Sequence, residues 1–510
     1  MEAKPKAHLF AFSVLALFTF VFLGSEYHFD IAFGELASAE AVVGAQAAIL
    51  ATSAVGLVGY SLVNRAAPAR CRSILAGALG VACTILLVAT QLTDNTQALL
   101  AHGCVLFLLL GALGNSTYFT VSLTQHASAA LARLVGASYA AGLLLQFALH
   151  ALAPNSIVEA FIIGCGIVAL GLLLAARRSV VQRPLGSETE KPSDQRVANE
   201  RMAHKEALLI LSCVALMACV FSTLDNVVTV ANAQGAFDLS TWPRLLLAVS
   251  GIAAGFAFDL THHRHSSLIM LCVTLLSLVS VLAIQVGGEA LLGLVVLYLA
   301  SGFFVVFFTT SFLRIAMSCA NPSFWAGMGR AANNLCAALV AAPCMALVSS
   351  GNALLVSTVG IVLFVGILIS VSALENTRRA AQRSAELEAL KLAGLGAPAS
   401  QTATAEEGKD AETESSGTAA AAEQPQAAGA EPKATQEAPF TAFAERYHLT
   451  PRERDVLVAV CSSEETLQCI ADEMGISLRA LQKHLTSIYR KSGTQSRAGL
   501  CAAAFTESQG

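Results

Sequence analysis

Residues 449–491 read LTPRERDVLVAVCSSEETLQCIADEMGISLRALQKHLTSIYRK, a pattern that predicts three short helices joined by tight connections. Thr450 is placed to cap the first helix, and Glu453 lies three residues further on, where it completes a capping box. Gly475 can adopt the positive φ that a sharp turn needs, and Ser477 can cap the helix that follows. This stretch is therefore expected to fold as a helix-turn-helix.

The last helix of the stretch, over residues 478–491, has one apolar face and one polar face. Leu481, Leu485 and Ile488 recur at the helical period and are expected to face the core. The outward positions hold Arg479, Gln482, Lys483, Thr486 and Arg490. A polar and basic outer face is what a helix needs in order to read the major groove of DNA.

These residues resemble the LuxR/FixJ-type (GerE-like) helix-turn-helix family from about Phe440 to Phe505. The matching positions are Leu449-Thr450-x-Arg452-Glu453, Val456-Leu457, Ile470-Ala471, Ser477, Lys483-His484-Leu485, Ile488-Tyr489, Lys491, Gly493 and Ser496-Arg497. Two features depart from the family pattern. Ala480-Leu481 stands where the family usually has Thr-Val, and the connection that precedes the second helix is longer.

The resemblance implies double-stranded DNA as a partner and gives roles to residues of the third helix. It implies contacts with base edges for Gln482, Lys483 and Thr486. It implies contacts with phosphates for Ser477, Arg479, Arg490 and Lys491. It also implies a homodimer through residues 494–505 on DNA. The alternative is a protein-binding helix-turn-helix, because acids and bases balance within residues 440–510.

Upstream of this domain the composition is that of a membrane protein. Only 13% of the 510 residues are charged, 55% are hydrophobic and the mean hydropathy is +0.64, whereas soluble domains carry about 25% charged residues. A bilayer core needs roughly 20 apolar residues of helix. Twelve segments qualify, near 8–28, 41–63, 74–92, 98–121, 131–153, 156–176, 206–231, 243–260, 266–287, 290–313, 325–349 and 352–374. The chain is expected to be all-α, with a polytopic twelve-helix transmembrane bundle before the small helix-turn-helix domain.

Basic residues set the expected topology, because Lys and Arg near helix ends stay on the cytoplasmic side. Lys4 and Lys6 precede the first predicted segment, and most other Lys and Arg residues near the membrane follow even-numbered segments. Arg314 and Arg330, which flank the loop after the tenth segment, belong to this set. The opposite loops carry acidic residues, with Arg244 as their cation. Both termini are therefore expected in the cytoplasm. A membrane bundle with a LuxR-type tail resembles regulators found in bacteria, which implies a bacterial cytoplasmic (inner) membrane.

A long charged loop at residues 177–205 divides the twelve segments into six and six. This two-halved arrangement resembles the major facilitator superfamily, whose halves are related by an axis along the membrane normal. Gly251 and Gly255 form a small-xxx-small pattern, which predicts close packing of helices. The transmembrane domain is expected to cover residues 1–376.

Residues 377–438 are expected to connect the two domains, and residues 439–510 to form the DNA-binding domain. The first part of the connection is rich in Ala, Glu, Leu, Arg and Lys, which predicts a polar helical extension of the last membrane segment. Residues 396–438 are rich in Ala, Glu, Thr, Gln, Gly and Pro and lack aromatic residues. Such a composition cannot bury a core, so a disordered tether is expected there.

Ionisable groups inside membrane helices are costly and are candidate functional groups. Four residues are ligand-sensing candidates on this ground: Glu26 and Asp30 in the first segment, Asp225 in the seventh and Arg244 in the eighth. Carboxylates and a guanidinium around one cavity would suit a small charged or zwitterionic ligand. The alternative is a headgroup position, which applies to Glu26, Asp30 and Arg244 but less well to Asp225, which lies farther from a predicted helix end.

The sequence offers no motif of enzyme chemistry. It has no phosphate-cradling loop and no GxSxG, and its 13 cysteines form no CxxC pair and no Cys/His cluster at zinc spacing, so neither a cofactor nor a metal is expected. The pattern favours a membrane-bound one-component transcriptional regulator that senses an unknown small molecule. The alternatives are a secondary transporter of the facilitator type with a regulatory tail, and a tail that docks proteins instead of DNA.

Overall fold

The computed structural model of the chain is helical almost throughout, and no strand occurs among the residues that it describes. Those residues are 3–176, 194–233, 243–260, 265–285, 290–350, 352–392, 438–462, 467–494 and 497–506. The chain divides into two compact units, Met1–Arg383 and Ser384–Gly510.

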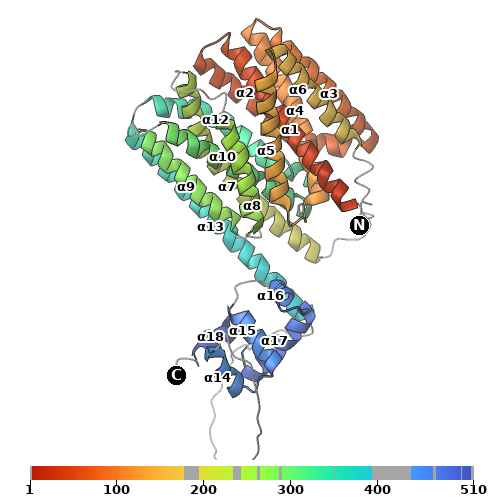
Figure 1. Cartoon of the computed structure of the whole chain (residues 1–510), viewed down its shortest axis with the longest axis vertical. Helices are drawn as coiled ribbons and strands as arrows, with labels where there is room; N and C mark the ends of the chain where they lie inside the picture. The colour runs from red at the N-terminus through yellow and green to blue at the C-terminus, as the bar shows by residue number, and fades with distance from the viewer. Residues whose placement is uncertain are drawn as a thin grey trace, which may run out of the picture. The chain divides into compact units, whose positions relative to one another are not determined.

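All twelve segments expected to cross the membrane are helices (Figure 1). They are α1 Ala3–Gly34, α2 Ala39–Ala66, α3 Ala69–Gln91, α4 Thr96–Gln125, α5 Leu131–Leu152, α6 Ser156–Ala176, α7 Asp194–Ala233, α8 Pro243–Leu260, α9 Ser266–Gln285, α10 Ala290–Ile315, α12 Met328–Ser349 and α13 Ala353–Leu392. Ten of them are long and apolar enough to span a bilayer, and α8 and α9 contribute shorter apolar stretches, Leu245–Leu260 and Ser266–Ser280. The predicted all-α membrane bundle is confirmed.

The structure adds helical residues at three places beyond the twelve predicted segments, and the polar extension of the last one is expected from the sequence. Helix α7 begins at Asp194, so residues 194–205, expected as a loop, are helical; they contain no Gly or Pro to end a helix. The rest of that loop, residues 177–193, lies outside the described residues, as does the expected tether from residue 396 to 437. A one-turn helix, α11 (Pro322–Trp325), precedes α12, and α13 continues as a polar helix to Leu392.

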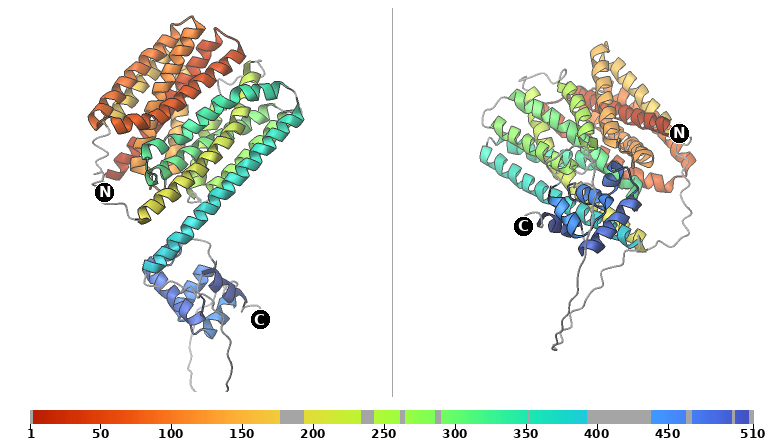
Figure 2. Two further views of the ribbon diagram at one scale, coloured as in Figure 1. Left: turned by 180° about the vertical axis from the view of Figure 1, so that it is seen from behind. Right: turned by 60° about the horizontal axis from the view of Figure 1, so that its bottom comes forward.

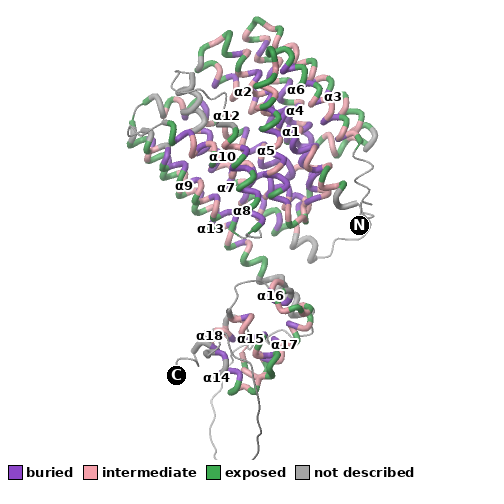
Figure 3. Tube along the Cα trace, viewed as in Figure 1, coloured by how far each residue is buried: buried purple, intermediate pink, exposed green. Residues whose placement is uncertain are grey.

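The membrane unit consists of two groups of helices, α1 to α6 and α7 to α13, which lie beside each other in Figure 2. Between the groups, α5 packs on α8 and α2 packs on α12. Buried residues gather along the inner helices, as the purple segments of α1 and α5 show in Figure 3. The outer helices instead expose large apolar side chains, among them Ile85, Leu172 and Ile361. An apolar outer surface of this kind is suited to lipid.

Helices α5 and α8 approach so closely that their backbones touch. A Cβ atom added to Gly136 would lie 2.2 Å from the carbonyl oxygen of Gly251, and one added to Gly255 would lie 2.7 Å from that of Ala132. The close packing predicted from the Gly251 and Gly255 pattern is therefore present. It is possible because glycine leaves room for the opposite backbone.

Asp259, one turn beyond Gly255, closes the same contact with hydrogen bonds. Its carboxylate accepts from the backbone N–H groups of Ala132 (3.1 Å) and Arg133 (2.8 Å), which belong to the first turn of α5. It also pairs with the Arg133 guanidinium, at 3.1 Å from Nε. A carboxylate at a helix N-terminus satisfies N–H groups that have no partner within the helix. The two halves are thus joined through a charged helix cap.

A second polar contact joins the halves at α2 and α12. The Asn334 amide of α12 donates to the Ser53 hydroxyl of α2 at 2.8 Å. Asn115, on α4, donates to the backbone oxygens of Leu57 and, at 2.9 Å, of Ser323. Because amide groups within an apolar bundle need hydrogen-bond partners, these contacts favour one arrangement of the helices.

The C-terminal unit holds five short helices: α14 Ala438–Arg446, α15 Pro451–Ser462, α16 Leu467–Glu473, α17 Leu478–Ser492 and α18 Arg497–Thr506. They enclose a separate hydrophobic core that contains Phe443, Leu457, Ile470, Leu485 and Leu500. Helix α14 is a finding of the structure, since the sequence patterns predict no helix before Thr450. Its Phe440 and Phe443 are buried in this core, and their burial explains why the helix forms.

The contact between α5 and α8 generates a prediction about stability. Substitution of Gly136→Ala forces the two backbones apart, and overpacking of this kind costs about 1–3 kcal/mol. We expect a lower melting temperature for the purified full-length protein in detergent. Gly44→Ala is the matched control, because nothing lies within 4 Å of a Cβ atom at Gly44. Equal melting temperatures for the two variants would contradict the close contact.

Candidate functional site

Helix α17 is held in place by its caps and its apolar face. Gly475 has φ +65°, which turns the chain before the helix, and the Ser477 hydroxyl accepts from the backbone N–H of Ala480 at 3.2 Å. Gly493, with φ +68°, ends the helix. The three apolar positions predicted to face the core, Leu481, Leu485 and Ile488, are buried. The opposite face of α17 is left for contact with another molecule.

The predicted DNA contacts lie on this opposite face. Lys483, Arg479 and Arg490 are exposed, and Gln482 and Thr486 are half-buried. Gln482 and Thr486 are one turn apart, and the Thr486 hydroxyl donates to the Gln482 carbonyl oxygen at 2.8 Å. Their base-reading roles stay predictions. The structure brings Gln482, Lys483 and Thr486 together within one helical turn, which is the arrangement that reading adjacent base edges requires.

Lys491 differs from the other predicted phosphate contacts, because its ammonium group is bound within the domain. Its Nζ lies 2.7 Å from a carboxylate oxygen of Glu453 and donates to the backbone oxygen of His448 at 2.9 Å. The side chain of Lys491 is 28% exposed and that of Glu453 is 6% exposed. The structure therefore gives Lys491 a role in joining the end of α17 to the start of α15.

Glu453 is also the centre of the predicted capping box, which the structure contains. Its carboxylate accepts from the Thr450 backbone N–H at 2.8 Å, and its own N–H donates to the Thr450 hydroxyl at 3.3 Å. Burial by itself raises the pKa of this carboxyl group. Hydrogen bonds from Lys491, Ser487 and Thr450 outweigh burial and lower the pKa from 4.5 to about 2. One carboxylate thus fixes both helix α15 and helix α17.

The segment predicted to dimerise, residues 494–505, covers all but the last residue of helix α18. Leu500 and Ala504 of this helix are buried in the core of their own domain. The Arg497 guanidinium donates to the backbone oxygen of Val460 at 3.1 Å. These contacts fix α18 on α15, and a homodimer through residues 494–505 stays a prediction.

The structure describes the side chains of two of the four ligand-sensing candidates, Glu26 and Asp30. Gln46 of α2 donates to the carboxylates of Glu26 (3.3 Å) and Asp30 (3.4 Å), so these two residues of α1 share one partner. Asp225 lies in α7 and Arg244 in α8, but their side chains lie outside the described residues. Their roles stay predictions.

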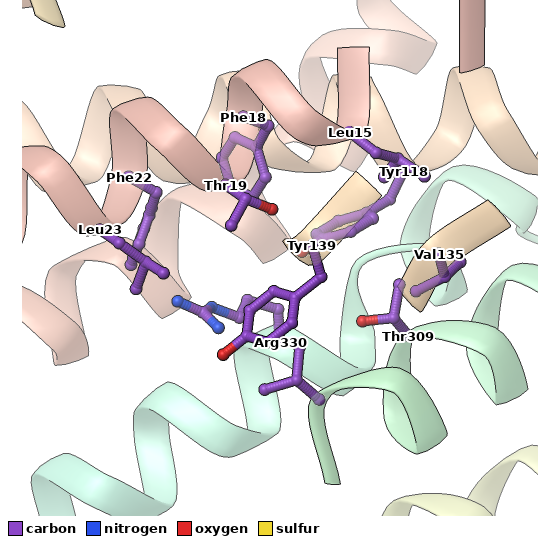
Figure 4. Close-up of a pocket in the computed structure, with 11 residues that line it drawn as sticks. Leu15, Phe18, Thr19, Phe22, Leu23, Tyr118, Val135, Tyr139, Thr309 and Arg330 are labelled. Carbon is purple, nitrogen blue, oxygen red and sulfur yellow. The ribbon is translucent and has the colours of Figure 1, made fainter. Parts of the chain in front are cut away.

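A pocket between the two halves contains Arg330, a residue that serves in the sequence only as a marker of topology. Arg330, at the start of α12, points into the bundle and lies over the Phe22 ring, with its Cζ 4.7 Å from the ring centroid. Figure 4 shows Arg330 and Tyr139 directed toward the side chains of α1. The lining residues are Leu15, Phe18, Thr19, Phe22, Leu23, Tyr118, Val135, Tyr139, Val305, Thr309 and Arg330. Five helices from both halves therefore meet here.

The pocket is closed around its charged group. Its volume of about 20 Å³ holds about one water molecule. Among the described residues, no carboxylate lies within ion-pair distance of Arg330. A cation in this position is a candidate for a role in function, because ionisable groups inside a membrane bundle are costly. Its one sequence signal is that Arg330 falls inside the predicted segment 325–349, beyond its first turn.

In the part of the chain that the structure describes, no group of three or more His, Cys, Asp and Glu side chains is arranged to hold a metal ion. The two candidate sites are therefore the outer face of α17 and the pocket around Arg330.

Comparisons with known proteins identify the two parts separately. Residues 447–504 match the family described as bacterial regulatory proteins, luxR family. This part of the chain is a LuxR-type helix-turn-helix domain, as the resemblance in the sequence predicted. A comparison of the chain with curated protein sequences finds no match.

The membrane unit has the fold of the major facilitator superfamily. The crystal structure of the superfamily transporter FucP in the outward conformation matches with a TM-score of 0.50 and 15% identity, covering 72% of this chain and 98% of that chain. A second structure, of a variant of the E. coli fucose:proton symporter FucP, matches with a TM-score of 0.43 and 13% identity, over 72% and 99% of the two chains. Proteins of the LuxR and facilitator kinds are typically not enzymes.

The depressed pKa of Glu453 generates a pH-dependent prediction. Because its folded pKa lies below 4.5, Glu453 stabilises the domain above about pH 4.5 and loses this effect as the pH falls toward 2. Glu453→Gln keeps a capping side chain but removes the ion pair with Lys491, at a cost of about 2 kcal/mol at pH 7.

Urea unfolding of the fragment 438–510, measured at pH 7 and pH 3, checks this prediction. The difference in free energy of unfolding between the wild-type fragment and the Glu453→Gln variant should be much smaller at pH 3 than at pH 7. A difference of the same size at both pH values would show that the ion pair does not set the stability of the domain.

Proposed function

We propose that this protein is a membrane-bound one-component transcriptional regulator. The observation that carries the proposal is a LuxR-type domain, whose α17 presents Lys483 to solvent, in one chain with a facilitator-like membrane bundle. A LuxR-type domain implies DNA as a partner, and the bundle implies a lipid bilayer. The chain therefore links a membrane event to a promoter.

The proposed orientation follows from the basic residues of the sequence. Lys and Arg concentrate after even-numbered segments, which favours cytoplasmic termini in a bacterial inner membrane. This orientation also leaves the DNA-binding domain in the compartment that contains DNA. Two separate lines of reasoning thus support the same orientation.

We propose that the bundle senses its ligand in the pocket around Arg330. The pocket is lined from both halves, so a ligand that separated the halves would change contacts on each of them. A guanidinium beside the hydroxyl groups of Tyr139, Tyr118 and Thr309 would suit a small molecule with an anionic group. Glu26 and Asp30 remain candidates for a second polar contact at the end of α1.

The alternative function is secondary transport of the facilitator type, with a tail that regulates it. The observation that favours it is the match of the membrane unit to a transporter fold. A transporter should accumulate a solute, and the accumulation should require Arg330. A sensor should lose its transcriptional response when Arg330 is changed, without moving any solute.

The DNA-binding role predicts the effect of a double substitution. Gln482→Ala with Lys483→Ala removes two proposed base contacts, each with a cost of about 1–3 kcal/mol. Promoter occupancy in the native host should fall to background in chromatin immunoprecipitation of the full-length protein. The control is Arg446→Ala, which removes an exposed cation of α14 outside the matched family residues. Peaks retained in the double variant would contradict DNA reading by α17.

The sensing role predicts a different effect for Arg330→Gln. Loss of a charge-assisted contact of about 1.5–3 kcal/mol should weaken the response to the ligand by roughly 10- to 100-fold. Promoter occupancy should persist, while reporter expression from those promoters should no longer change between growth conditions. Arg65→Gln, which removes an exposed cation, is the control. An unchanged response in Arg330→Gln would exclude this pocket as the sensing site.

A further inference from the structure

A second cavity lies within the second half of the bundle, and it shares no lining residue with the pocket around Arg330. It has a volume of about 200 Å³ and is enclosed by α7, α9, α10 and α13 together with Phe258 of α8. An apolar cavity of about 150 Å³ is large enough to hold benzene. The second cavity can therefore take a small organic molecule.

The polar wall of this cavity comes from two successive turns of α10. The Arg314 guanidinium has a buried Nε and a buried Nη2, and neither nitrogen has a hydrogen-bond partner within the described part of the chain. The Thr310 hydroxyl, one turn earlier, is also buried without a described partner. Nε and Nη2 form the edge of a guanidinium that binds two oxygens of one oxyanion. These donors are arranged for an anion with three acceptor oxygens.

The other charges of the cavity are already paired. The Arg378 guanidinium of α13 lies 2.7 Å from a carboxylate oxygen of Glu206 and 3.7 Å from one of Glu375, and it donates to the Ser267 hydroxyl at 3.2 Å. Among the described residues, no carboxylate lies within 4.0 Å of the Arg314 guanidinium. Arg314 therefore has no close ion-pair partner in the described wall, and the Asp259 carboxylate acts on it only from beyond contact distance. A buried charge without a close partner is costly.

The rest of the wall is partly polar, with Ser266, Ser311 and Ser318, and partly apolar. Phe258 of α8, Phe307 of α10 and Ile210 of α7 line the cavity beside the polar donors. Aromatic and aliphatic side chains provide a surface for the non-polar part of a ligand. The cavity thus combines an anion-binding edge with an apolar compartment.

We propose that this cavity binds an organic phosphate. The phosphoryl oxygens accept from Arg314 Nε and Nη2 and from the Thr310 hydroxyl, and the organic substituent lies against Phe258 and Phe307. A phosphate fits better than a carboxylate because it supplies a third oxygen for Thr310 while two oxygens engage the guanidinium. The cavity lies where α10 ends and where α9 begins, the end of the bundle that the basic residues assign to the cytoplasm. The phosphate can belong to a soluble phosphomonoester or to the headgroup of an anionic lipid.

The first arm of the test uses phenyl phosphate as the probe, with phenol as the uncharged comparison. Full-length protein in nanodiscs of phosphatidylcholine is titrated by isothermal calorimetry. We expect phenyl phosphate to bind and phenol not to bind. Arg314→Gln should weaken binding at least 10-fold, and Thr310→Val, which keeps the shape of the side chain, should weaken it several-fold. Arg379→Gln should bind as the wild type does, because Arg379 is exposed and does not line the cavity.

The second arm uses nanodiscs that contain phosphatidic acid and measures retained lipid by native mass spectrometry. Retention that depends on Arg314 and Thr310, without binding of phenyl phosphate, identifies a lipid headgroup as the source of the phosphate. Should Arg314→Gln not be recovered as folded protein, Thr310→Val decides the outcome in both arms. Binding that is equal in all variants, or absent in both arms, overturns the proposal. Neither arm depends on DNA binding or on Arg330, so the result is separate from the proposed regulatory function.

Discussion

The membrane unit depends on the contact between α5 and α8, where two backbones meet without side chains between them. Gly136, Gly251 and Gly255 permit the approach, and Asp259 fixes it by accepting from the first N–H groups of α5. Side chains of ordinary size would hold the helices 8–10 Å apart. The two halves consequently share a rigid joint, and any rearrangement that opens the pocket around Arg330 has to pivot about it or break it.

The charges inside the bundle fall into two groups with different consequences. Asp259 with Arg133, and Glu206 with Arg378, are close ion pairs. Such pairs fix geometry, since removal of one partner leaves a buried charge. Arg330 instead lies over the Phe22 ring, and Arg314 has two guanidinium nitrogens without a described hydrogen-bond partner; no described carboxylate forms a close ion pair with either residue. Their charge is thus available to a ligand, and this difference distinguishes the two proposed sites from the structural ion pairs.

The sequence predicts the DNA-binding domain in detail, because its signals are local. A capping box needs Thr450 and Glu453 three residues apart, and a turn needs Gly475, so both follow from spacing alone. The partnership of Lys491 with Glu453 is not local: it joins residues 38 apart on two helices whose relative position the sequence does not specify. Helix α14 escapes prediction for a similar reason, since its formation depends on the burial of Phe440 and Phe443 in a core built by later helices.

The difference between local and non-local signals also explains how much of the membrane sites can be predicted from the sequence. The number of segments follows from apolar length. Gly251 and Gly255 predict a close helix contact, but the identity of the partner helix, α5, comes from the structure. The positive-inside rule uses the charge of Arg314 and Arg330 but says nothing about where a side chain points. From the sequence alone, each of these two arginines is therefore equally consistent with a position in a cytoplasmic loop and with a position in a cavity of the bundle. Only the tertiary structure distinguishes these two positions, because the direction of an arginine side chain depends on the helices packed around it.

The separation into two units limits how a ligand in the bundle can act on DNA. Helix α13 ends at Leu392 and α14 begins at Ala438, and the composition between them cannot bury a core. That composition predicts a flexible tether, and a flexible tether cannot transmit a rotation of α13 as a rigid lever would. A tether instead sets the effective concentration of the DNA-binding domain near its partner. Control of DNA binding is then most readily achieved by a change in association between copies of the bundle, which would raise the local concentration of a second DNA-binding domain.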